Sequence, residues 1–245
     1  MKTIHQIDDH DVKPIIKFQQ PFTCLMAGSS GSGKTTFVKR FLKHASSLCT
    51  PFNKIIWCFS GNGRPNDIQE GIQYMNGLPQ DFECLFKDDD DDDEVNSPKL
   101  IILDDLMTDA CSSSEILDIF TKHSHHYNIS VFLLVQNIFH KGHFSRDISL
   151  NSKYIVLFKN PRDRSQIYHL ARQICPTCPK EVVDIYNEAT VKPFSYLLFD
   201  NCQTTNDQIR LRTCIFPDEM TIVYVPISTT TTTNTDHETI EIQCS

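Results

Sequence analysis

One segment constrains the fold more than any other: the Gly- and Ser-rich loop at residues 28–35, which lies between an apolar run and a helical pattern. Residues 22–27 are a strand candidate, and residues 34–46 have the composition of a helix. Glycine and small polar residues allow the chain to turn tightly between the two elements. A strand, a tight loop and a helix in this order indicate an α/β fold.

Residues 28–35 read Gly-Ser-Ser-Gly-Ser-Gly-Lys-Thr, the complete pattern of a loop that binds nucleotide phosphates. Small residues allow backbone N–H groups to point at a phosphate, and the start of the following helix adds partial positive charge. We expect Lys34 to reach the β- and γ-phosphate oxygens and the Thr35 hydroxyl to bind Mg²⁺. The pattern therefore predicts ATP and Mg²⁺ as cofactors. The residues expected to contact the nucleotide are Gly28, Ser29, Ser30, Gly31, Ser32, Gly33, Lys34, Thr35 and Thr36.

Two adjacent acids follow another apolar run. Residues 100–103 are Leu-Ile-Ile-Leu, and Asp104 and Asp105 come next. Ligands of open α/β sheets bind at the carboxyl ends of the strands, so both carboxylates are expected beside the phosphate loop. We expect Asp104 to hold Mg²⁺ and Asp105 to polarise the attacking water. The alternative for Asp105 is a helix-capping role. The usual second acid at this position in ATP-hydrolysing motors is Glu rather than Asp.

A polar side chain also ends a third apolar run. Residues 129–135 are continuously apolar except for one serine, and Gln136 follows. An amide at this strand end is expected to lie near the γ-phosphate and to sense or orient it. The alternative is an ordinary hydrogen bond between Gln136 and a loop, and residue chemistry alone does not separate the two interpretations.

The rest of the chain continues the alternation of strands and helices. Further strands are predicted at residues 54–59 and 154–158, and helices at 67–74, 113–123, 165–173 and 179–188. Apolar strands separated by helices indicate a mostly parallel sheet flanked by helices. Residues 196–200 and 209–216 flank a polar turn and predict a late β-hairpin. The predicted class is α/β, a P-loop NTPase fold of the additional-strand catalytic-acid type, because a strand at 54–59 separates the two motifs along the chain.

The expected organisation is an N-terminal arm at residues 1–20, an ATPase domain at 21–217 and a threonine-rich, disordered tail at 218–245. The net charge is −8, but residues 88–94, six aspartates and a glutamate, contribute seven of the negative charges and leave the remainder at −1. We expect this run to be a solvated, disordered loop, because its charges repel one another. The body of the chain can therefore still present a basic patch to nucleic acid.

The ten cysteines are scattered through predicted core strands and are expected to be free, buried thiols. Cys175 and Cys178 form a C-x-x-C pair, but no second pair has zinc-ligand spacing, so a metal site is not expected there. A cluster of histidines, His123, His125 and His126, is expected to be structural or to face phosphate, because adjacent side chains diverge.

No apolar run is long enough to span a bilayer, and residues 1–17 contain no apolar signal segment. We therefore expect neither a membrane partner nor secretion.

Four segments, residues 120–130, 135–139, 146–152 and 158–163, resemble viral genome-packaging ATPases of the FtsK/HerA superfamily. The resemblance is to the poxvirus-type branch, most of all to the packaging ATPases of the Polinton/Maverick and adintovirus group. It covers the chain from residue 22 to residue 217, including the late hairpin with its Arg-Leu-Arg sequence. The phosphate loop alone is generic, whereas Gln-Asn at 136–137 and Lys-Asn-Pro-Arg-Asp at 159–163 are much more specific.

This resemblance implies a ring of identical subunits that moves double-stranded DNA into a preformed capsid and binds ATP between neighbours. It places Lys34 and Thr35 on the Walker A motif, Asp104 and Asp105 on the Walker B motif and Gln136 on the polar sensor. It also implies capsid or portal proteins as partners and a location inside the infected or host cell, in association with virions. The acidic run and the threonine-rich tail depart from the family pattern as insertions.

An arginine supplied in trans is expected to complete the site, because the motifs above contain none and hydrolysis builds charge on the γ-phosphoryl oxygens. Arg146 is the first candidate, since it lies in the loop after the Gln136 strand, where a neighbouring subunit could dock. Arg162 and Arg164 are further candidates. The alternative is that Arg146 pairs with an acid such as Asp147 and only shapes the loop.

Three other functions remain open from the sequence: a different ring-forming DNA translocase or helicase, a nucleotide kinase, and a nucleotide switch without turnover. Dependence on a capsid would distinguish packaging from other translocation. A kinase would carry an arginine-rich lid, which the sequence does not contain. The paired acids and Gln136 argue against a switch.

Overall fold

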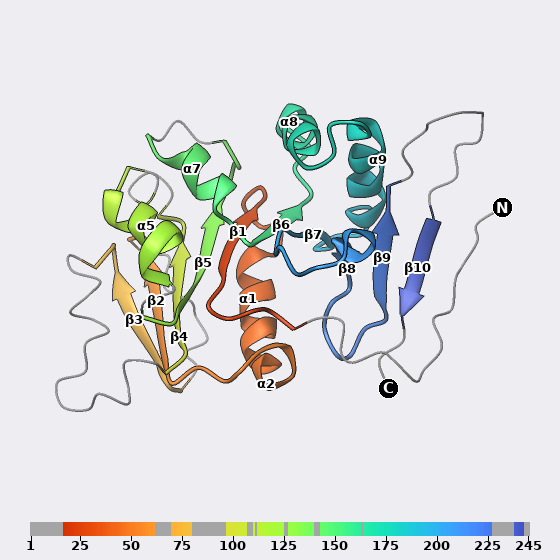
Figure 1. Cartoon of the computed structure of the whole chain (residues 1–245). Helices are drawn as coiled ribbons and strands as arrows, with labels where there is room; N and C mark the ends of the chain where they lie inside the picture. Colours follow the sequence, from red (N-terminus) through yellow and green to blue (C-terminus); the bar gives the residue numbers. More distant parts are fainter. Residues whose placement is uncertain are drawn as a thin grey trace.

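The computed structural model describes residues 17–61, 70–79, 97–106, 110, 112–124, 127–139, 143–162 and 164–226, together with the backbone of 238–242. Most of the expected arm, the acidic run at 88–94 and the threonine tract at 229–233 lie outside these residues. The described strands form one sheet in the order β10-β9-β8-β7-β6-β1-β5-β4-β2-β3. Figure 1 shows this sheet running across the width of the molecule.

One part of the sheet is parallel. Its strands are β1 (Thr23–Ala27), β2 (Lys54–Phe59), β3 (Ile72–Asn76), β4 (Lys99–Asp104), β5 (Ile129–Val135) and β6 (Tyr154–Phe158). Strand β1 pairs in parallel with both β5 and β6, and β4 pairs in parallel with β5 and β2. The strand that intervenes in space between the two motif strands, β1 and β4, is therefore β5, while β2 lies on the far side of β4.

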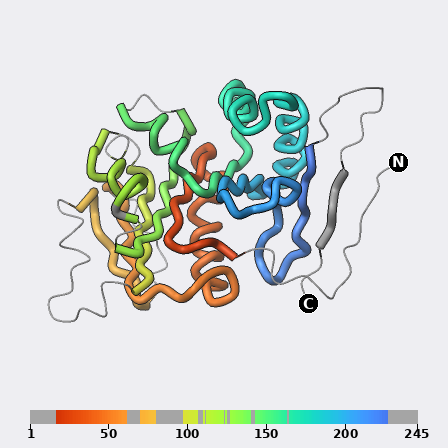
Figure 2. The backbone as a smooth tube through the Cα atoms, viewed as in Figure 1, coloured from red at the N-terminus to blue at the C-terminus, as the bar shows by residue number. Residues whose placement is uncertain are grey.

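The other part of the sheet is antiparallel. Its strands are β7 (Tyr196–Asp200), β8 (Leu211–Thr213), β9 (Thr221–Val225) and β10 (Glu238–Ile242). Strands β7 and β8 pair in antiparallel register, which confirms the late hairpin. Strands β9 and β10 continue the sheet within residues 218–245, where the sequence led us to expect a tail. Figure 2 shows the two parts on opposite sides of the molecule, and they meet where β6 pairs with β7.

Helices cover both faces of the sheet because the strands are apolar on both faces. The helices are α1 (Lys34–Lys43), α2 (Ala45–Leu48), α5 (Ser114–Asp118), α7 (Ser145–Leu150), α8 (Ser165–Ile174) and α9 (Pro179–Ala189), with a π-helix at Ile119–His123 and a 3-10 helix at Asp207–Ile209. Residues of α1 and α2 belong to one core, and residues of α5, α7, α8 and α9 to the other. No helix in the described part of the chain is both long and apolar enough to cross a membrane.

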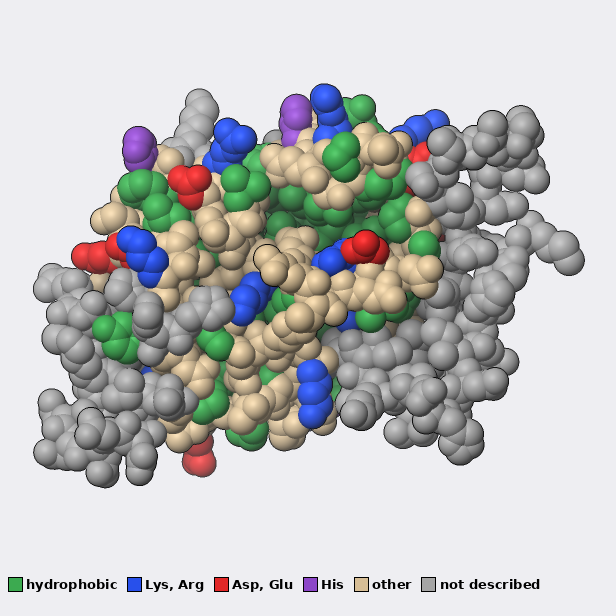
Figure 3. Space-filling view, in the orientation of Figure 1, with side chains coloured by type: hydrophobic (Ala, Val, Ile, Leu, Met, Phe, Trp, Pro, Cys, Tyr) green, Lys and Arg blue, Asp and Glu red, His purple; other side chains and the backbone are tan. Residues whose placement is uncertain are grey.

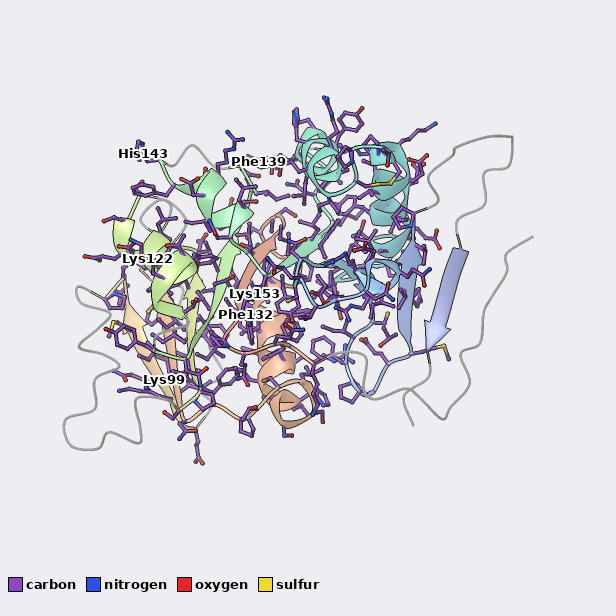
Figure 4. The ribbon with its side chains drawn as sticks, viewed as in Figure 1. Lys99, Lys122, Phe132, Phe139, His143 and Lys153 are labelled. Carbon is purple, nitrogen blue, oxygen red and sulfur yellow. A yellow bond between two sulfur atoms is a disulfide. The ribbon has the colours of Figure 1, made fainter. Side chains whose placement is uncertain are left out.

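An aromatic cluster fixes α1, the helix that follows the phosphate loop, against the sheet. Phe41 of α1 packs edge-on against Phe132 of β5, with ring centroids 4.9 Å apart, and Phe22 lies 5.2 Å from Phe132. Figure 4 labels Phe132 between the strands and α1. Such aromatic pairs contribute about 0.5–1.5 kcal/mol each beyond their buried area. The start of α1 is thereby held at the carboxyl end of β1.

Two local expectations are corrected by the structure. Residues 72–74 lie in strand β3 rather than in a helix, because Ile72–Asn76 pairs in parallel with β2 at the edge of the sheet. Cys175 and Cys178 form a disulfide rather than two free thiols. The turn between α8 and α9 brings their Cα atoms to 5.3 Å, within bridging distance, and the N–H of Cys178 donates to the carbonyl of Cys175.

Among the described residues, Cys24, Cys49, Cys58, Cys202 and Cys214 are free. The first four are buried and Cys214 is half-buried. These five match the expectation of free thiols.

Candidate functional site

The phosphate loop turns tightly between β1 and α1. Gly31 and Gly33 have φ values of 73° and 109°, in the left-handed region that favours glycine. A Cβ atom on Gly28 would lie 2.6 Å from both Phe158 Cβ and Ser32 Oγ, so the loop also needs glycine there for space. Helix α1 begins directly after Gly33, with no acid in its first turn. Its exposed N–H groups and partial positive charge are therefore available to an anion.

Lys34 is held back against its own loop. Its Nζ donates to the carbonyl oxygen of Gly28 at 2.6 Å and to that of Ser29 at 3.1 Å. Burial lowers the pKa of Lys34, and the nearby carboxylates of Asp104 and Asp105 oppose that shift. A phosphate brought into this position would add negative charge and so favour the protonated amine.

Thr35 and Asp104 meet across the gap between α1 and β4. The Thr35 hydroxyl donates to Asp104 Oδ2 at 3.2 Å. Burial raises the pKa of Asp104, whereas the Thr35 hydrogen bond and the charge of Lys34 oppose the shift. A carboxylate whose charge is disfavoured by burial gains most from a bound cation.

Asp105 and Gln136 form the next pair along the strand ends. Gln136 Nε2 donates to Asp105 Oδ1 at 3.3 Å, and both side chains are exposed. Asp105 has φ 56°, a left-handed conformation that few residues other than Gly, Asn and Asp adopt. The Gln136 amide therefore bonds the second acid rather than a loop carbonyl. Ala110 is helical and its N–H donates to the carbonyl oxygen of Leu106, directly after Asp105, at 2.8 Å, so the helix-capping role of Asp105 stays an alternative to the catalytic one.

These groups line one open cavity of about 320 Å³ at the carboxyl ends of β1, β4 and β5. Its lining residues are Ser30, Gly31, Ser32, Gly33, Lys34, Thr35, Thr36, Asp104, Asp105, Leu134, Gln136 and Phe194. Gly28 and Ser29 lie at the base of the loop, where they accept the hydrogen bonds from Lys34. The structure therefore brings the phosphate loop and Asp104 together with Asp105 and Gln136, at the ends of three strands.

The arginine candidates lie elsewhere. Arg146 is exposed on α7 and does not line the cavity; in the described residues it makes no ion pair with Asp147. Arg162 lines a neighbouring cavity of about 620 Å³, which shares Ser30 and Gln136 with the first and also contains Ser29, Asn137, Asn160 and Pro161. The reserve candidate Arg162 is therefore nearer to the phosphate loop of its own subunit than Arg146 is.

The residues present fit ATP and Mg²⁺. Ser32 Oγ is buried and has no hydrogen-bond partner among the described residues, which leaves a hydroxyl donor for a phosphate oxygen. Mg²⁺ is usually held by one or two protein oxygens together with water and substrate phosphates, and Thr35 and Asp104 supply such oxygens. No cluster of three or more His, Cys, Asp or Glu side chains suited to a metal occurs in the described residues. His125 and His126 and the side chain of His123 lie outside them.

Sequence reasoning missed Phe194, which lines the cavity from the connection between α9 and β7. An available signal was the sequence Lys-Pro-Phe-Ser at 192–195, because proline commonly starts a turn. Strand β7 runs antiparallel to β6, so this turn lies at the carboxyl end of β6, on the edge that carries the phosphate loop.

Comparisons with known proteins identify similar structures. No protein-family model matches the chain, and no curated protein matches it in sequence. The genome packaging NTPase B204 from Sulfolobus turreted icosahedral virus 2, solved with ATP-gammaS, is similar in structure with a TM-score of 0.53 and 11% identity, over 80% of this chain and 97% of that chain. The DNA-packaging ATPase B204 from Sulfolobus Turreted Icosahedral Virus has a TM-score of 0.52 and 13% identity, over 80% and 98%. At these identities the likeness concerns the fold, which is that of a P-loop NTPase.

Proposed function

We propose that this chain is an ATPase whose hydrolysis drives double-stranded DNA into a viral or transposon capsid. The observation that carries the ATPase part is the convergence of Lys34, the Thr35–Asp104 pair and the Asp105–Gln136 pair on one cavity. The similarity of fold to two DNA-packaging enzymes supports the motor part. The proposed ATPase domain begins at residue 21 and extends past 217 to include β9.

In the proposed mechanism, the loop N–H groups and the start of α1 bind the β-phosphate, and Lys34 moves from the carbonyls of Gly28 and Ser29 to the β- and γ-phosphate oxygens. Thr35 and Asp104 would hold Mg²⁺. When bound, Mg²⁺ neutralises charge on the β- and γ-phosphates. Loss of the Lys34 bonds to its own loop opens room for the phosphate without a change in fold.

Asp105 is the proposed general base. Its carboxylate orients a water for attack on the γ-phosphorus and takes the water's proton as the bond from the γ-phosphorus to the bridging oxygen breaks and ADP leaves. The Gln136 amide holds the Asp105 carboxylate in place in the free state and can turn to the γ-phosphate when nucleotide binds. In this mechanism Asp105 accepts the proton of the attacking water, and Gln136 senses the γ-phosphate.

DNA is the proposed cargo. Several cations on α7, α8 and α9 are exposed, and Figure 3 shows Lys and Arg side chains along this upper edge of the molecule. They include Arg146, Arg164, Arg172 and Lys180. Contacts between such cations and backbone phosphates bind DNA without sequence preference and weaken steeply as salt increases.

ATPase activity with and without duplex DNA, together with the solution mass, tests this proposal. The expected protein is a homo-oligomer whose Mg²⁺-dependent ATPase is stimulated by duplex DNA. Lys34→Ala should lose about 10²-fold or more in turnover, as expected when one charge stabiliser of the transition state is removed. Lys43→Ala, on the exposed side of the same helix, is the matched control. Wild-type turnover in Lys34→Ala would reject the proposed ATPase site. Dependence of DNA translocation on an empty capsid or portal would distinguish packaging from other kinds of translocation.

A trans-acting arginine is part of the proposed ring mechanism. Arg146→Ala and Lys34→Ala should each be inactive, but mixed rings should regain part of the activity, because an intact Lys34 site can face an intact Arg146. Arg162→Ala mixed with Lys34→Ala provides the comparison. If Arg162 acts within its own subunit, that mixture should not recover. Full activity of Arg146→Ala alone would exclude Arg146 as the donor.

A further inference from the structure

An unusual turn places Phe194 at the nucleotide cavity. The N–H of Ser195 donates to the carbonyl of Lys192 at 3.2 Å, which closes a four-residue turn. Pro193 occupies its second position, and Phe194, at the third, has φ 64°. A proline followed by a positive φ describes a type II turn, whose third position favours glycine or asparagine. A bulky aromatic residue in this conformation is an outlier that needs an explanation.

Packing within the subunit does not supply that explanation. Phe194 is 67% exposed, so burial of its ring does not offset the strain of its backbone conformation. It lies against the phosphate loop, where a Cβ on Gly33 would be 3.3 Å from both Phe194 Cβ and Cδ1. Backbone strain that packing does not repay is typical of functional positions.

The sheet order places Phe194 at the end of the cavity away from the acids. Strands β5 and β4, which carry Gln136, Asp104 and Asp105, lie on one side of β1, whereas β6 and β7 lie on the other. The acids and Gln136 are at the γ-phosphate end in the proposed function. Because a nucleoside triphosphate is linear, its base lies at the opposite end, on the β7 side. Phe194 is the residue that lines the cavity from that side in the described part of the chain.

We propose that Phe194 stacks on the base of the bound nucleotide, and that the site accepts purine and pyrimidine triphosphates alike. This inference rests on the proposed nucleotide binding, and it specifies which bases the nucleotide site accepts. Stacking on an aromatic ring tolerates every base, because each base has a π-face. Among the described lining residues, the β7 side contributes no amide or charged side chain that would distinguish one base edge from another.

The test compares nucleotides with a ligand that has no base. Dissociation constants for Mg²⁺ complexes of ATP, GTP, CTP and inorganic tripolyphosphate are measured by calorimetry on the full-length protein. Phe194→Ala should weaken binding of all three nucleotides by about 5- to 150-fold, the range for loss of one base–aromatic stack, and leave tripolyphosphate within twofold. Phe194→Tyr should restore wild-type affinity. Val191→Ala changes an exposed residue of the same connection that does not line the cavity, and should bind like wild type.

Each outcome decides the proposal. Equal ATP affinity in wild type and Phe194→Ala would overturn it. Equal loss of ATP and tripolyphosphate would show that Phe194 only supports the loop at Gly33, which also overturns it. Wild-type affinities for GTP or CTP more than 100-fold weaker than for ATP would overturn the tolerance of bases. Wild-type protein that binds neither nucleotide nor tripolyphosphate would refute the nucleotide site itself, and the inference with it.

Discussion

The two parts of the sheet use polar residues in opposite ways. In the parallel part, Asp104, Asp105 and Gln136 stand at the strand ends, where one is half-buried and two are exposed. In the antiparallel part, Asp200 and Arg212 are buried within the strands and form an ion pair with each other. Asp200 also accepts a hydrogen bond from the N–H of Cys202 at 3.0 Å. One arrangement keeps polar groups accessible to a ligand, and the other encloses them.

Helix α1 connects the two parts. Its N-terminus forms the phosphate site, while Arg40 on the same helix pairs with Asp218 and Glu219, each at 2.6 Å, and stacks over Phe216 at 4.3 Å. These contacts fix α1 to the segment before β9. The antiparallel part supports the site, and the accessible polar groups of the parallel part supply the residues for the chemistry. Substitutions in the two parts should therefore have separable effects.

The largest expected effect is on turnover, from Asp105→Asn. The amide cannot accept the proton of the attacking water, so turnover should fall by about 10²- to 10⁴-fold, as for loss of a general base. Stability should be unchanged, because Asn tolerates the left-handed conformation that Asp105 adopts. Steady-state ATPase assays and thermal melts measure both. Asp207→Asn, an exposed acid of the antiparallel part, should retain full turnover; unchanged turnover in Asp105→Asn would remove it from the proposed mechanism.

The second effect is on stability, from Arg212→Met. This change leaves the Asp200 carboxylate buried without its cation and should lower the free energy of unfolding by about 3–5 kcal/mol. Turnover per folded molecule should stay at the wild-type value. Denaturant unfolding measures the loss, and Asp207→Ala, which breaks the exposed pair with Arg210, should cost at most about 1 kcal/mol. If Arg212→Met were as stable as wild type but impaired in turnover, Arg212 would act in the chemistry rather than in the support of the fold.

A third, smaller effect depends on pH. Burial raises the pKa of Asp104 above its ordinary value of 3.8, so ionised Asp104 lowers stability at neutral pH. This contribution is absent below pH 3.8 and develops as the pH rises through the raised pKa. Asp104→Asn should therefore melt at a higher temperature than wild type at pH 7, and the difference should shrink toward pH 4. Addition of Mg²⁺ and nucleotide should stabilise only the wild type. If the melting temperature of Asp104→Asn exceeded that of wild type by the same amount at every pH, the ionised Asp104 carboxylate would not be the cause of the difference.

Most of the parallel part could be predicted from the sequence, because strands buried on both faces are continuous apolar runs. The run at 100–103 became β4 with one more residue at each end, and the run at 129–135 became β5 without change. Strand β3 could not be predicted in this way. It is a half-exposed edge strand, Ile-Gln-Tyr-Met-Asn, and its pairing with β2 determines its conformation. Strand β9 follows a polar turn close to the threonine tract, so composition alone favoured a tail.

The site divides in the same way. The sequence predicted the phosphate loop because it has a complete motif, and Asp104, Asp105 and Gln136 because each directly follows an apolar run or its first acid. It did not predict that Gln136 bonds Asp105, since that contact depends on β5 lying next to β4. Nor did it predict the Phe194 conformation. A positive φ at phenylalanine contradicts the residue's own preference and is decided by the closed turn and the antiparallel direction of β7.

The smallest expected effect has the opposite sign, and it concerns Phe194, which lines the cavity from the connection between α9 and β7. Phe194→Asn replaces a residue that the left-handed conformation disfavours with one that tolerates it, so the free energy of unfolding should rise by about 1 kcal/mol. Little packing is lost, because the Phe194 ring is largely exposed. The same variant should bind ATP more weakly, because the amide offers no ring for stacking. Denaturant unfolding and ATP titration of one preparation measure both. A variant that loses stability would mean that the Phe194 ring supports the fold, and the division between supporting and accessible groups would then fail at this turn.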